Sequence, residues 1–483
     1  MHHKKLEQYR LEQLGDKNIA ELQQEMAEGK LTSEELVLMY KENISLSGES
    51  INAVLEFNPE AVQIAQALDF ERLRKGARSP LHGIPILLKD NMDTGDMMHT
   101  SAGSLALKDH YALSDAKVAE KLRKAGAVIL GKTNMTEWAN FMTDKMNNGF
   151  SSRGGQVKNP YGAFDVGGSS SGSAAAVAAN LAAAAIGTET SGSIIDPAAR
   201  NSLVGIKPTV GMISRSGIIP ISWTQDTAGP LARTVEDAVM VFAQLIGRDP
   251  EDAVTAFAEP FESYNWKRHF NKDGLVGVKL GVPRNLFQAK LPNEELELFN
   301  KALERLRQCG AQIIDDIDLG VTQEDLGFAV LLHEFKASIN NYLAKSDLGN
   351  PIRSLDDVIA FNLAHAADTL KFGQNLFEQA AGTSGKLTER EYVEALERNR
   401  FLAGKQGISA TLKKTGADAL VLPKDYGCNI GAAAGFPSIT VPFSYSREYE
   451  PFNITFTGKA FSEPELIECA YAFEQAVQGR RKP

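Results

Sequence analysis

The stretch AAAVAANLAAAAI, residues 174 to 186, constrains the fold more than any other part of the sequence. Its side chains are small and apolar except for that of Asn180, so a helix formed from it has to be buried on all sides. A membrane span needs about 20 apolar residues, which is more than this stretch supplies. We therefore expect a buried helix at the centre of a large folded body.

Short apolar runs alternate with helical patterns along most of the chain. Residues 84 to 88 and 127 to 130, for example, have the length of buried strands. The helical patterns between such runs predict a mostly parallel or mixed β-sheet that is covered on both faces. Residues 1 to 70 are expected to form a helical segment packed on this core, with a capping box between Thr32 and Glu35.

Charge, cysteine content and the N-terminal residues exclude several classes of protein. The net charge is −10 and the longest basic run is Arg480-Arg481-Lys482, so we expect no surface for nucleic-acid phosphates. The three cysteines lie far apart in the sequence, which predicts neither a disulfide framework nor a zinc site. The N-terminal residues lack the apolar segment of a signal peptide. These features predict a cytoplasmic protein that binds neither nucleic acid nor membranes.

Two motifs for other chemistries fail in their details. Residues 126 to 133, GAVILGKT, satisfy the G-x-x-x-x-G-K-[ST] pattern of nucleotide-binding loops. The four middle residues, however, favour a buried strand over a loop, so an NTPase is a weak alternative. His333-Glu334 begins like the H-E-x-x-H zinc motif, but Ala337 stands where the second histidine is needed. We therefore expect no metal ion.

The serine-rich loop before the apolar stretch, GGSSSGS at residues 167 to 173, offers candidate nucleophiles. Gly168 to Gly172 match the G-x-S-x-G pattern of a hydrolase nucleophile elbow, which would make Ser170 the nucleophile. An elbow also needs a strongly apolar strand before it and a downstream acid and histidine. Residues 161 to 166 are weak as a buried strand. Ser170 therefore has the helix that follows an elbow serine, but not the strongly apolar strand that precedes one.

Chain geometry favours a different serine. A helix over residues 173 to 184 rises about 18 Å, and a strand over residues 185 to 191 returns about 20 Å. This path would bring Ser193 back beside Ser169. Ser193 is therefore a better candidate than Ser170.

The residues around Ser193 also form a candidate oxyanion hole. Asp196 is a favourable N-cap and Pro197 a favourable first residue for the next helix. Thr190 to Ser193 would then form a tight turn that contains glycine. Backbone N–H groups in such a turn can face a developing oxyanion.

A serine nucleophile without a histidine partner needs another base, and Lys89 is the candidate. It follows the five apolar residues Ile84 to Leu88, so its side chain emerges from a buried strand. Burial disfavours the charged ammonium and lowers a lysine pKa from about 10.4 toward neutrality. Asp90 is expected to point to the opposite face of the strand, so it need not cancel this effect.

Residues 83 to 233 and 418 to 475 together resemble the amidase signature family. The resemblance is carried by GGSSSGSAAAVAANLAAAAIGTETSGSI and, further on, by VGIKPTVGMISRSGIIPISWTQDTAGPLARTVEDA. Within the family, the chain is similar to bacterial peptide amidases, notably in GFSSRGGQVKNPY and GTETSGSI. The resemblance implies an α/β fold with a single large twisted mixed β-sheet flanked by helices on both faces. It also implies a catalytic domain over residues 71 to 483, in which residues of about 250 to 415 form a variable, mainly helical region that shapes the substrate site.

The resemblance further implies a Ser-Ser-Lys triad and no cofactor. By position, Ser193 is similar to the family's acyl-forming nucleophile, Ser169 to its bridging serine and Lys89 to its base. Gly168 is expected to precede Ser169 through a cis peptide bond, and Ser170 to support the turn. The implied substrate and oxyanion contacts share one turn, formed by Thr190, Ser191, Gly192 and Ser193.

Two positions separate this chain from many members of the family. Ile195 stands where those members have an arginine that would meet the carboxylate of a free amino acid, and Ser191 replaces a glycine. We therefore expect a serine amidohydrolase that cleaves C-terminal amides of peptides, or similar acyl amides, through an acyl-enzyme and releases ammonia. The alternative is a glutamine-dependent amidotransferase A-type subunit. The expected partner is the amide substrate alone, on a monomer or homodimer.

Overall fold

A computed structural model describes residues 2–346 and 349–483 of the chain. Most of its strands belong to one sheet. They are β1 (Val54–Phe57), β2 (Pro85–Lys89), β3 (Val128–Thr133), β6 (Ala184–Glu189), β7 (Val204–Lys207), β8 (Thr227–Ala232), β9 (Lys279–Gly281), β10 (Gln312–Ile314), β11 (Ala419–Pro423), β12 (Ser438–Tyr445) and β13 (Pro451–Thr457). These strands form an 11-stranded sheet in the order β1-β3-β2-β6-β8-β7-β12-β13-β11-β9-β10. A separate two-stranded ribbon consists of β4 (Phe150–Ser151) and β5 (Gly155–Gln156).

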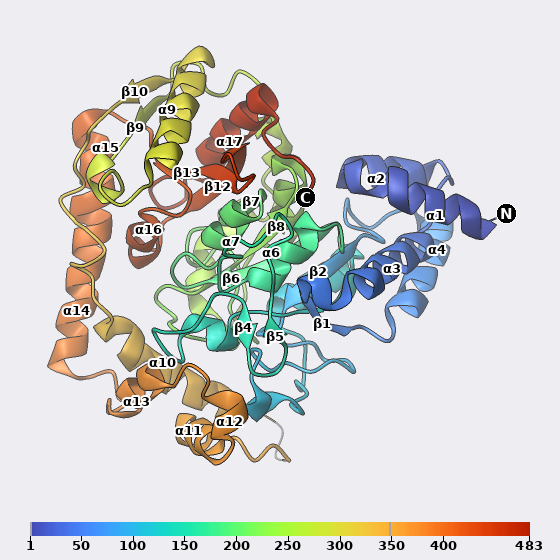
Figure 1. Ribbon diagram of the computed structural model, residues 1–483, viewed down its shortest axis with the longest axis horizontal. Coiled ribbons are helices and arrows are strands. Elements are labelled where there is room, and N and C mark those ends of the chain that lie inside the picture. Colours follow the sequence, from blue (N-terminus) through green and yellow to red (C-terminus); the bar gives the residue numbers. More distant parts are fainter. Residues whose placement is uncertain (1, 347–348) are drawn as a thin grey trace.

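The α-helices lie around this sheet (Figure 1). They are α1 (His2–Glu12), α2 (Ile19–Ala27), α3 (Ser33–Ile51), α4 (Ala61–Lys75), α5 (Lys117–Ala125), α6 (Ser171–Ala178), α7 (Ile195–Arg200), α8 (Val235–Leu245), α9 (Asn293–Gln308), α10 (Ala329–Ala344), α11 (Leu355–Ala364), α12 (Ala366–Thr369), α13 (Asn375–Ala381), α14 (Arg390–Arg400), α15 (Ala410–Thr415), α16 (Cys428–Ala434) and α17 (Glu463–Val477). No helix in the described ranges is long and apolar enough to cross a membrane.

The sheet contains both parallel and antiparallel pairs. β2 runs parallel to its neighbours β3 and β6, and β9 runs parallel to β10 and β11. Between these two parallel groups, the successive neighbours β6, β8, β7, β12, β13 and β11 are antiparallel. Parallel neighbours need a crossover connection, and helices supply it. The expected α/β fold with one large mixed sheet is confirmed.

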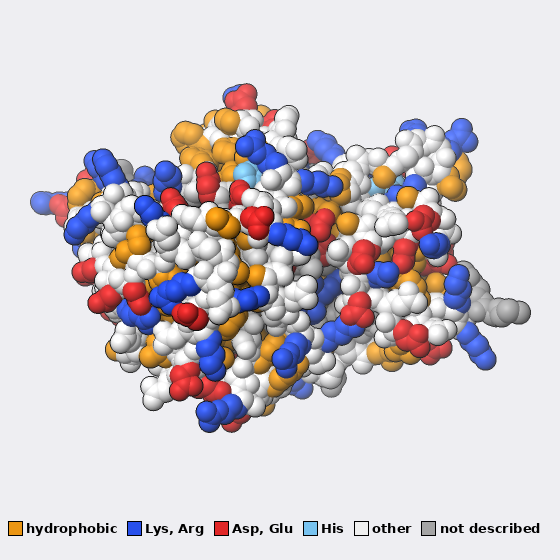
Figure 2. All heavy atoms as spheres, turned by 90° about the horizontal axis from the view of Figure 1, so that it is seen from above, with side chains coloured by type: hydrophobic (Ala, Val, Ile, Leu, Met, Phe, Trp, Pro, Cys, Tyr) orange, Lys and Arg blue, Asp and Glu red, His pale blue; other side chains and the backbone are white. Residues whose placement is uncertain are grey.

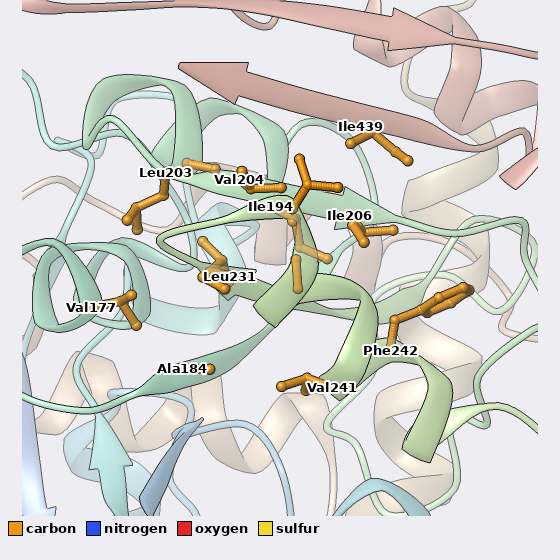
Figure 3. Close-up of a cluster of buried hydrophobic side chains, with 14 of the residues drawn as sticks. Val177, Ala184, Ile194, Leu203, Val204, Ile206, Leu231, Val241, Phe242 and Ile439 are labelled. Atoms are coloured by element: carbon orange, nitrogen blue, oxygen red, sulfur yellow. The ribbon is translucent and has the colours of Figure 1, made fainter. Parts of the chain in front are cut away.

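Helices cover both faces of the sheet. α6 packs against β2, β6 and β8 and contacts α7, which packs against β7, β12 and β13. α8 packs against β6, β7 and β8 and contacts α5 and α17. Figure 3 shows apolar side chains of these elements, among them Val177, Val204, Leu231 and Phe242, all of them fully buried. The serine-rich region therefore lies next to strands at the centre of the core, because the helix that it begins, α6, packs on β2, β6 and β8.

The buried helix predicted from the alanine-rich stretch is present but shorter than expected. α6 spans residues 171 to 178, whereas the sequence suggested 173 to 184. The chain leaves the helix at Asn180, which adopts a left-handed backbone with φ of 58°, and its carbonyl accepts a hydrogen bond from Asn43 Nδ2 at 2.8 Å. Asparagine tolerates this conformation better than the surrounding alanines.

The N-terminal helices pack beside the β1 edge of the sheet (Figure 1). The predicted capping box is present, because Thr32 and Glu35 accept hydrogen bonds from each other's backbone N–H groups. Leu22 and Leu36 belong to the same apolar core as the central strands. The N-terminal helices therefore contribute side chains to this core, and the division of the chain at residue 70 stays a prediction.

The helices between residues 322 and 415 form a second apolar cluster with the segment that follows β3. The Trp138 and Phe377 rings lie 5.5 Å apart, and the Phe141 and Phe335 rings 5.0 Å apart. Tyr342 on α10 donates a hydrogen bond to Asp93 at 2.6 Å. These contacts hold α10 and α13 against the segments that follow β2 and β3.

The surface of the molecule carries both signs of charge. Acidic and basic side chains are interspersed over the face seen in Figure 2. This distribution is typical of a solvated protein surface.

Gly172 in α6 generates a prediction about stability. An added Cβ there would lie 2.3 Å from the Asn134 carbonyl oxygen and 2.5 Å from that of Ala53. Because both contacts are backbone atoms, Gly172→Ala should lower the free energy of unfolding by about 1 to 3 kcal/mol. The measurement is the denaturant midpoint of unfolding.

Gly404→Ala is the matched control, because its added Cβ would meet no closer contact than Ala434 Cβ at 3.5 Å. This variant should unfold at the wild-type midpoint or above it. Equal midpoints for the two variants would contradict close packing of α6.

Candidate active site

Lys89 is the last residue of β2, and its side chain is fully buried. Its Nζ lies 2.7 Å from Ser169 Oγ, 2.9 Å from Thr188 Oγ1 and 3.3 Å from the Thr188 carbonyl oxygen. Burial lowers the pKa of Lys89 to about 7, although the nearby carboxylates of Glu189 and Asp226 oppose this shift. A substantial fraction of Lys89 is therefore neutral near pH 7.

Asp90, the next residue, faces away from Lys89 as expected. Its Oδ2 accepts hydrogen bonds from the Gly103 N–H at 3.0 Å and from the Ser101 hydroxyl. Asp90 thus bonds to groups other than the Lys89 amine, in agreement with the alternation of side chains along a strand.

The turn that carries Ser169 lies between Asp165 and the start of α6. The Gly168–Ser169 peptide bond is cis, as the resemblance implies. The Gly168 N–H donates a hydrogen bond to Asp196 Oδ2 at 2.9 Å. A Cβ at Gly168 would lie 2.6 Å from both Thr136 Oγ1 and Asn148 Oδ1, so a larger residue would require these side chains to move.

Ser193 lies in the turn between β6 and α7, where 8% of its surface is exposed. The Ser170 N–H donates to the Ser193 carbonyl oxygen at 3.2 Å. Ser193 has thus returned beside the Ser169 turn, as the chain geometry predicts. Among the described residues, no hydrogen bond joins the Ser169 and Ser193 hydroxyls directly.

The turn before α7 presents backbone donors. Within the described part of the chain, the N–H groups of Ser191, Gly192 and Ser193 donate no hydrogen bond. Gly192 has a φ of 82°, which favours glycine. The turn is fixed on one side by Thr190, whose hydroxyl donates to Asp226 at 2.5 Å. Free, preorganised N–H groups of this kind can bind an oxyanion.

The predicted N-cap of the helix after Ser193 is wrong. α7 begins at Ile195, and Asp196 lies inside its first turn. The carboxylate of Glu189 instead accepts hydrogen bonds from the Ile194 and Ile195 N–H groups at 2.7 and 3.0 Å. Because Glu189 reaches these N–H groups from the end of β6, Asp196 is left to bind the Ser169 turn.

Asp196 links α7 to the Ser169 turn. Besides the Gly168 N–H, it accepts a hydrogen bond from Arg200 Nε at 2.7 Å. Burial and the neighbouring carboxyl of Asp425 raise the pKa of Asp196 to about 7, and Arg200 opposes that rise. The two serine-bearing turns are therefore joined by one buried carboxyl group.

Ser170, the candidate for a nucleophile elbow, bonds to β6. Its hydroxyl donates to the Thr188 carbonyl at 3.1 Å and accepts from the Thr188 N–H at 3.2 Å. The side chain is fully buried. With both contacts made to one strand residue, Ser170 fastens the turn to the sheet.

A cavity of about 380 Å³ opens beside Ser193. Its lining is mainly apolar or uncharged, and Asp144 is the one charged side chain among the described lining residues. The other lining residues are Ala139, Asn140, Phe141, Thr143, Gly168, Thr190, Ser191, Ser193, Ile221, Gln225, Gln323, Leu326, Gly327, Phe328, Leu331, Leu376, Asn399, Asn429 and Ala433. Seven of these lining residues lie between residues 322 and 415: Gln323, Leu326, Gly327, Phe328, Leu331, Leu376 and Asn399. A role of this region in shaping the substrate site stays a prediction.

The cavity wall contains a strained segment. Trp138, Ala139 and Asn140 have φ values of 50°, 53° and 67°, all in the left-handed region. Successive non-glycine residues of this kind are rare and concentrate at functional sites. The helices α10 and α13 pack on Trp138 and Phe141 and hold this segment in place.

Several contact residues are missing from the sequence-based site. Thr188, Asn91 and Asp226 surround Lys89 or the Ser193 turn. Thr188 lies within the GTETSGSI motif and Asn91 lies two residues after Lys89, so both could have been named as site candidates from the sequence. Asp226 comes from a loop whose approach to the turn is a tertiary contact.

The two motifs for other chemistries lie elsewhere. Lys132 is inside strand β3, where its Nζ donates to the Met92 carbonyl oxygen at 2.7 Å, so residues 126 to 133 form no phosphate-binding loop. His333 and Glu334 lie in α10. In the described ranges, no group of three or more His, Cys, Asp or Glu side chains is arranged to hold a metal ion.

Comparisons with known proteins agree with this architecture. Residues 35–467 match the family model for amidases. A probable amidase of Arabidopsis thaliana is 42% identical over 94% of this chain and 89% of its own length. The A-type subunit of the glutamyl-tRNA(Gln) amidotransferase from Alkaliphilus metalliredigens is 32% identical over 95% of this chain and 96% of its own length.

A solved structure is similarly close. The native peptide amidase of Stenotrophomonas maltophilia superimposes with a TM-score of 0.89, at 42% identity, over 97% of this chain and 98% of its own. The family model and the first relative each cover most of the chain. The chain therefore belongs to the amidase family and is an amide hydrolase.

Proposed function

We propose that this chain hydrolyses carboxamides through an acyl-enzyme on Ser193, with Lys89 as the base and Ser169 as the proton relay. The observation that carries the proposal is the contact of 2.7 Å between the buried Lys89 amine and Ser169 Oγ, beside the Ser193 turn. A serine hydroxyl is a weak nucleophile until a base takes its proton. Lys89 supplies that base because burial holds its pKa at about 7.

In the first half of the reaction, the Ser193 oxygen attacks the carboxamide carbon. The Ser193 proton passes to Ser169, whose own proton passes to Lys89. The Ser169 and Ser193 hydroxyls have to approach for this transfer, and catalytic hydrogen bonds often tighten only when substrate binds. Lys89, now an ammonium, returns its proton through Ser169 to the leaving nitrogen, and ammonia departs as the C–N bond breaks.

In the second half, water attacks the ester on Ser193 and releases the carboxylic acid. Both tetrahedral intermediates carry negative charge on the former carbonyl oxygen. The N–H groups of Ser191, Gly192 and Ser193 are placed to bind that oxygen, with Thr190 fixing the turn through Asp226. Gly168 and Ser170 support the relay by holding the Ser169 turn against α7 and β6.

We further propose C-terminal amides of peptides, or similar acyl amides, as substrates. A volume of about 380 Å³ accommodates a short acyl chain, and its lining combines apolar side chains with neutral amides. Asp144 would repel a substrate carboxylate and tolerate a positive charge. The peptide amidase of Stenotrophomonas maltophilia, with 42% identity, supports this substrate class.

The amidotransferase A-type subunit is the second candidate, supported by the relative that carries this name. Glutamine, however, has an α-carboxylate that needs a cationic partner. The cavity lining has no lysine or arginine among the described residues, and Ile195, at the position of the expected arginine, is fully buried. A cytoplasmic location and a monomeric or homodimeric state stay predictions.

Ser193→Ala should abolish hydrolysis of a peptide amide, with a loss of at least about a thousandfold in kcat. The measurement is ammonia release, combined with covalent labelling of the protein by a fluorophosphonate. Ser170→Ala is the matched control, since it removes a neighbouring hydroxyl without removing the attacking oxygen. Label retained in Ser193→Ala and lost in Ser170→Ala would establish the elbow serine as the nucleophile instead.

The activity should fall with the protonation of Lys89. Because the pKa of Lys89 is lowered to about 7, the neutral base is abundant above that pH and is lost below it. The kcat/KM of the wild type should therefore fall as the pH drops through about 7. Lys89→Met should lower kcat by roughly 10²- to 10⁴-fold, and an unchanged pH profile in this variant would contradict the assignment of the base.

The charge of the substrate should decide which amides are hydrolysed efficiently. Neutral and cationic peptide amides should be hydrolysed with higher kcat/KM than free glutamine, because the lining offers a carboxylate and no basic group. A panel of short peptide amides, glutamine and aliphatic amides, followed by ammonia release, measures this. Preferred turnover of glutamine that rises with partner subunits would favour the amidotransferase.

A further inference from the structure

We propose that Asn91 is a positioning residue for the base, acting with one water molecule in the small cavity behind Thr188. Together they turn the Thr188 hydroxyl away from Lys89, so that the amine lone pair faces Ser169. The inference rests on the proposed function of Lys89. It concerns the orientation of the base rather than its identity.

The Lys89 amine can make only a limited set of hydrogen bonds. A neutral amine has two N–H groups and one lone pair, and Lys89 Nζ contacts three oxygen atoms. The Thr188 carbonyl oxygen can only accept, so it takes one N–H. The base works only if the second N–H goes to Thr188 Oγ1, which leaves the lone pair for the Ser169 hydroxyl. If the Thr188 hydroxyl donated to Lys89 instead, the lone pair would be blocked.

Asn91 limits what the Thr188 hydroxyl can do. Its Nδ2 donates to Thr188 Oγ1 at 3.0 Å. A hydroxyl accepts up to two hydrogen bonds and donates one. With Asn91 and Lys89 as the two donors, the Thr188 hydroxyl proton needs an acceptor other than the Lys89 lone pair.

A small enclosed cavity provides the place for that acceptor. Its volume is about 20 Å³, which is enough for one water molecule. Its polar lining residues include Asn91, Thr188, Thr190, Arg215 and Asp226. A buried water is held where two to four polar groups converge, and this lining supplies them.

The side-chain oxygen of Asn91 also needs a hydrogen-bond donor. The side chain is 2% exposed, and its Oδ1 has no hydrogen-bond partner among the described residues. Leaving a buried amide oxygen unpaired is costly. One water accepts the Thr188 hydroxyl proton and donates to Asn91 Oδ1, so both groups are satisfied together.

The charges of two nearby carboxylates also act on Lys89 and contribute to any pH dependence that is measured. Glu189 follows Thr188 on β6, and Asp226 lies beside the Thr190 turn; both favour the charged lysine. Burial raises the pKa of Asp226 to about 6. Substitutions of Asn91 leave these groups in place, so a change in the pH profile reports on Asn91 itself.

The test compares Asn91→Leu and Asn91→Asp in the full-length protein. In Asn91→Leu the Thr188 hydroxyl is free to donate to Lys89, so kcat should fall about tenfold to a hundredfold with little change in KM. The acid limb of the pH profile should move to lower pH, because the neutral amine is stabilised. In Asn91→Asp the limb should move to higher pH by about 1 to 3 pH units, because a carboxylate favours the ammonium.

Opposite shifts of the acid limb support the positioning role, and unshifted limbs in both variants overturn it. The pH dependence of fluorophosphonate labelling at Ser193 gives the same readout without an amide substrate. Asn362→Leu is the matched control, since Asn362 is a buried asparagine on α11 with an unpaired Oδ1 outside the site. It should leave the acid limb unchanged.

A crystal structure gives a second measurement that does not depend on variant folding. One water should lie within hydrogen-bond distance of both Asn91 Oδ1 and Thr188 Oγ1. An unoccupied cavity, or a water bonded to neither atom, would overturn the proposal. Loss of the proposed function is recognised separately, because Ser193→Ala would then retain activity or wild-type protein would release no ammonia.

Discussion

The proposed mechanism depends on the burial of one amine. Lys89 ends a fully buried strand, and its Nζ is surrounded by oxygen atoms of Ser169 and Thr188 rather than by water. Desolvation is the largest influence on its pKa, and the carboxylates of Glu189 and Asp226 act against it. If water reached this amine, Lys89 would return to its ordinary charged state and could not serve as the proposed base.

The central fold is arranged to keep that environment closed. α6 carries only small side chains, so the turn before it and the strand after it approach closely. Ser170 ties the turn to Thr188 on β6, and Asp196 ties it to α7. The first bond holds Ser169 beside Thr188, which also contacts Lys89, and the second holds the Ser169 turn beside the helix that follows Ser193.

The sequence predicted much of the fold, and it named the residues of the proposed site that the structure brings close together. The alternation of apolar runs and helical patterns indicated the mixed sheet, and the capping box at Thr32 located the start of α3. The length of α6 was overestimated, because alanine favours helix whereas Asn180 turns the chain through a left-handed conformation. Asp196 was misassigned as an N-cap, because the competing carboxylate of Glu189 reaches the same N–H groups from β6.

The sequence by itself determined which chemical groups are present: a lysine at the end of an apolar strand, serines on both sides of an alanine-rich segment, and isoleucine rather than arginine at position 195. Only the tertiary structure decided their relations. Asn91, Thr188 and Asp226 meet around Lys89 through strand pairing and loop contacts, and the left-handed segment at Trp138 forms the cavity wall under α10 and α13. The reason is physical: periodicity reports which side chains are buried, whereas hydrogen-bond partners depend on the register between segments that are far apart in the chain.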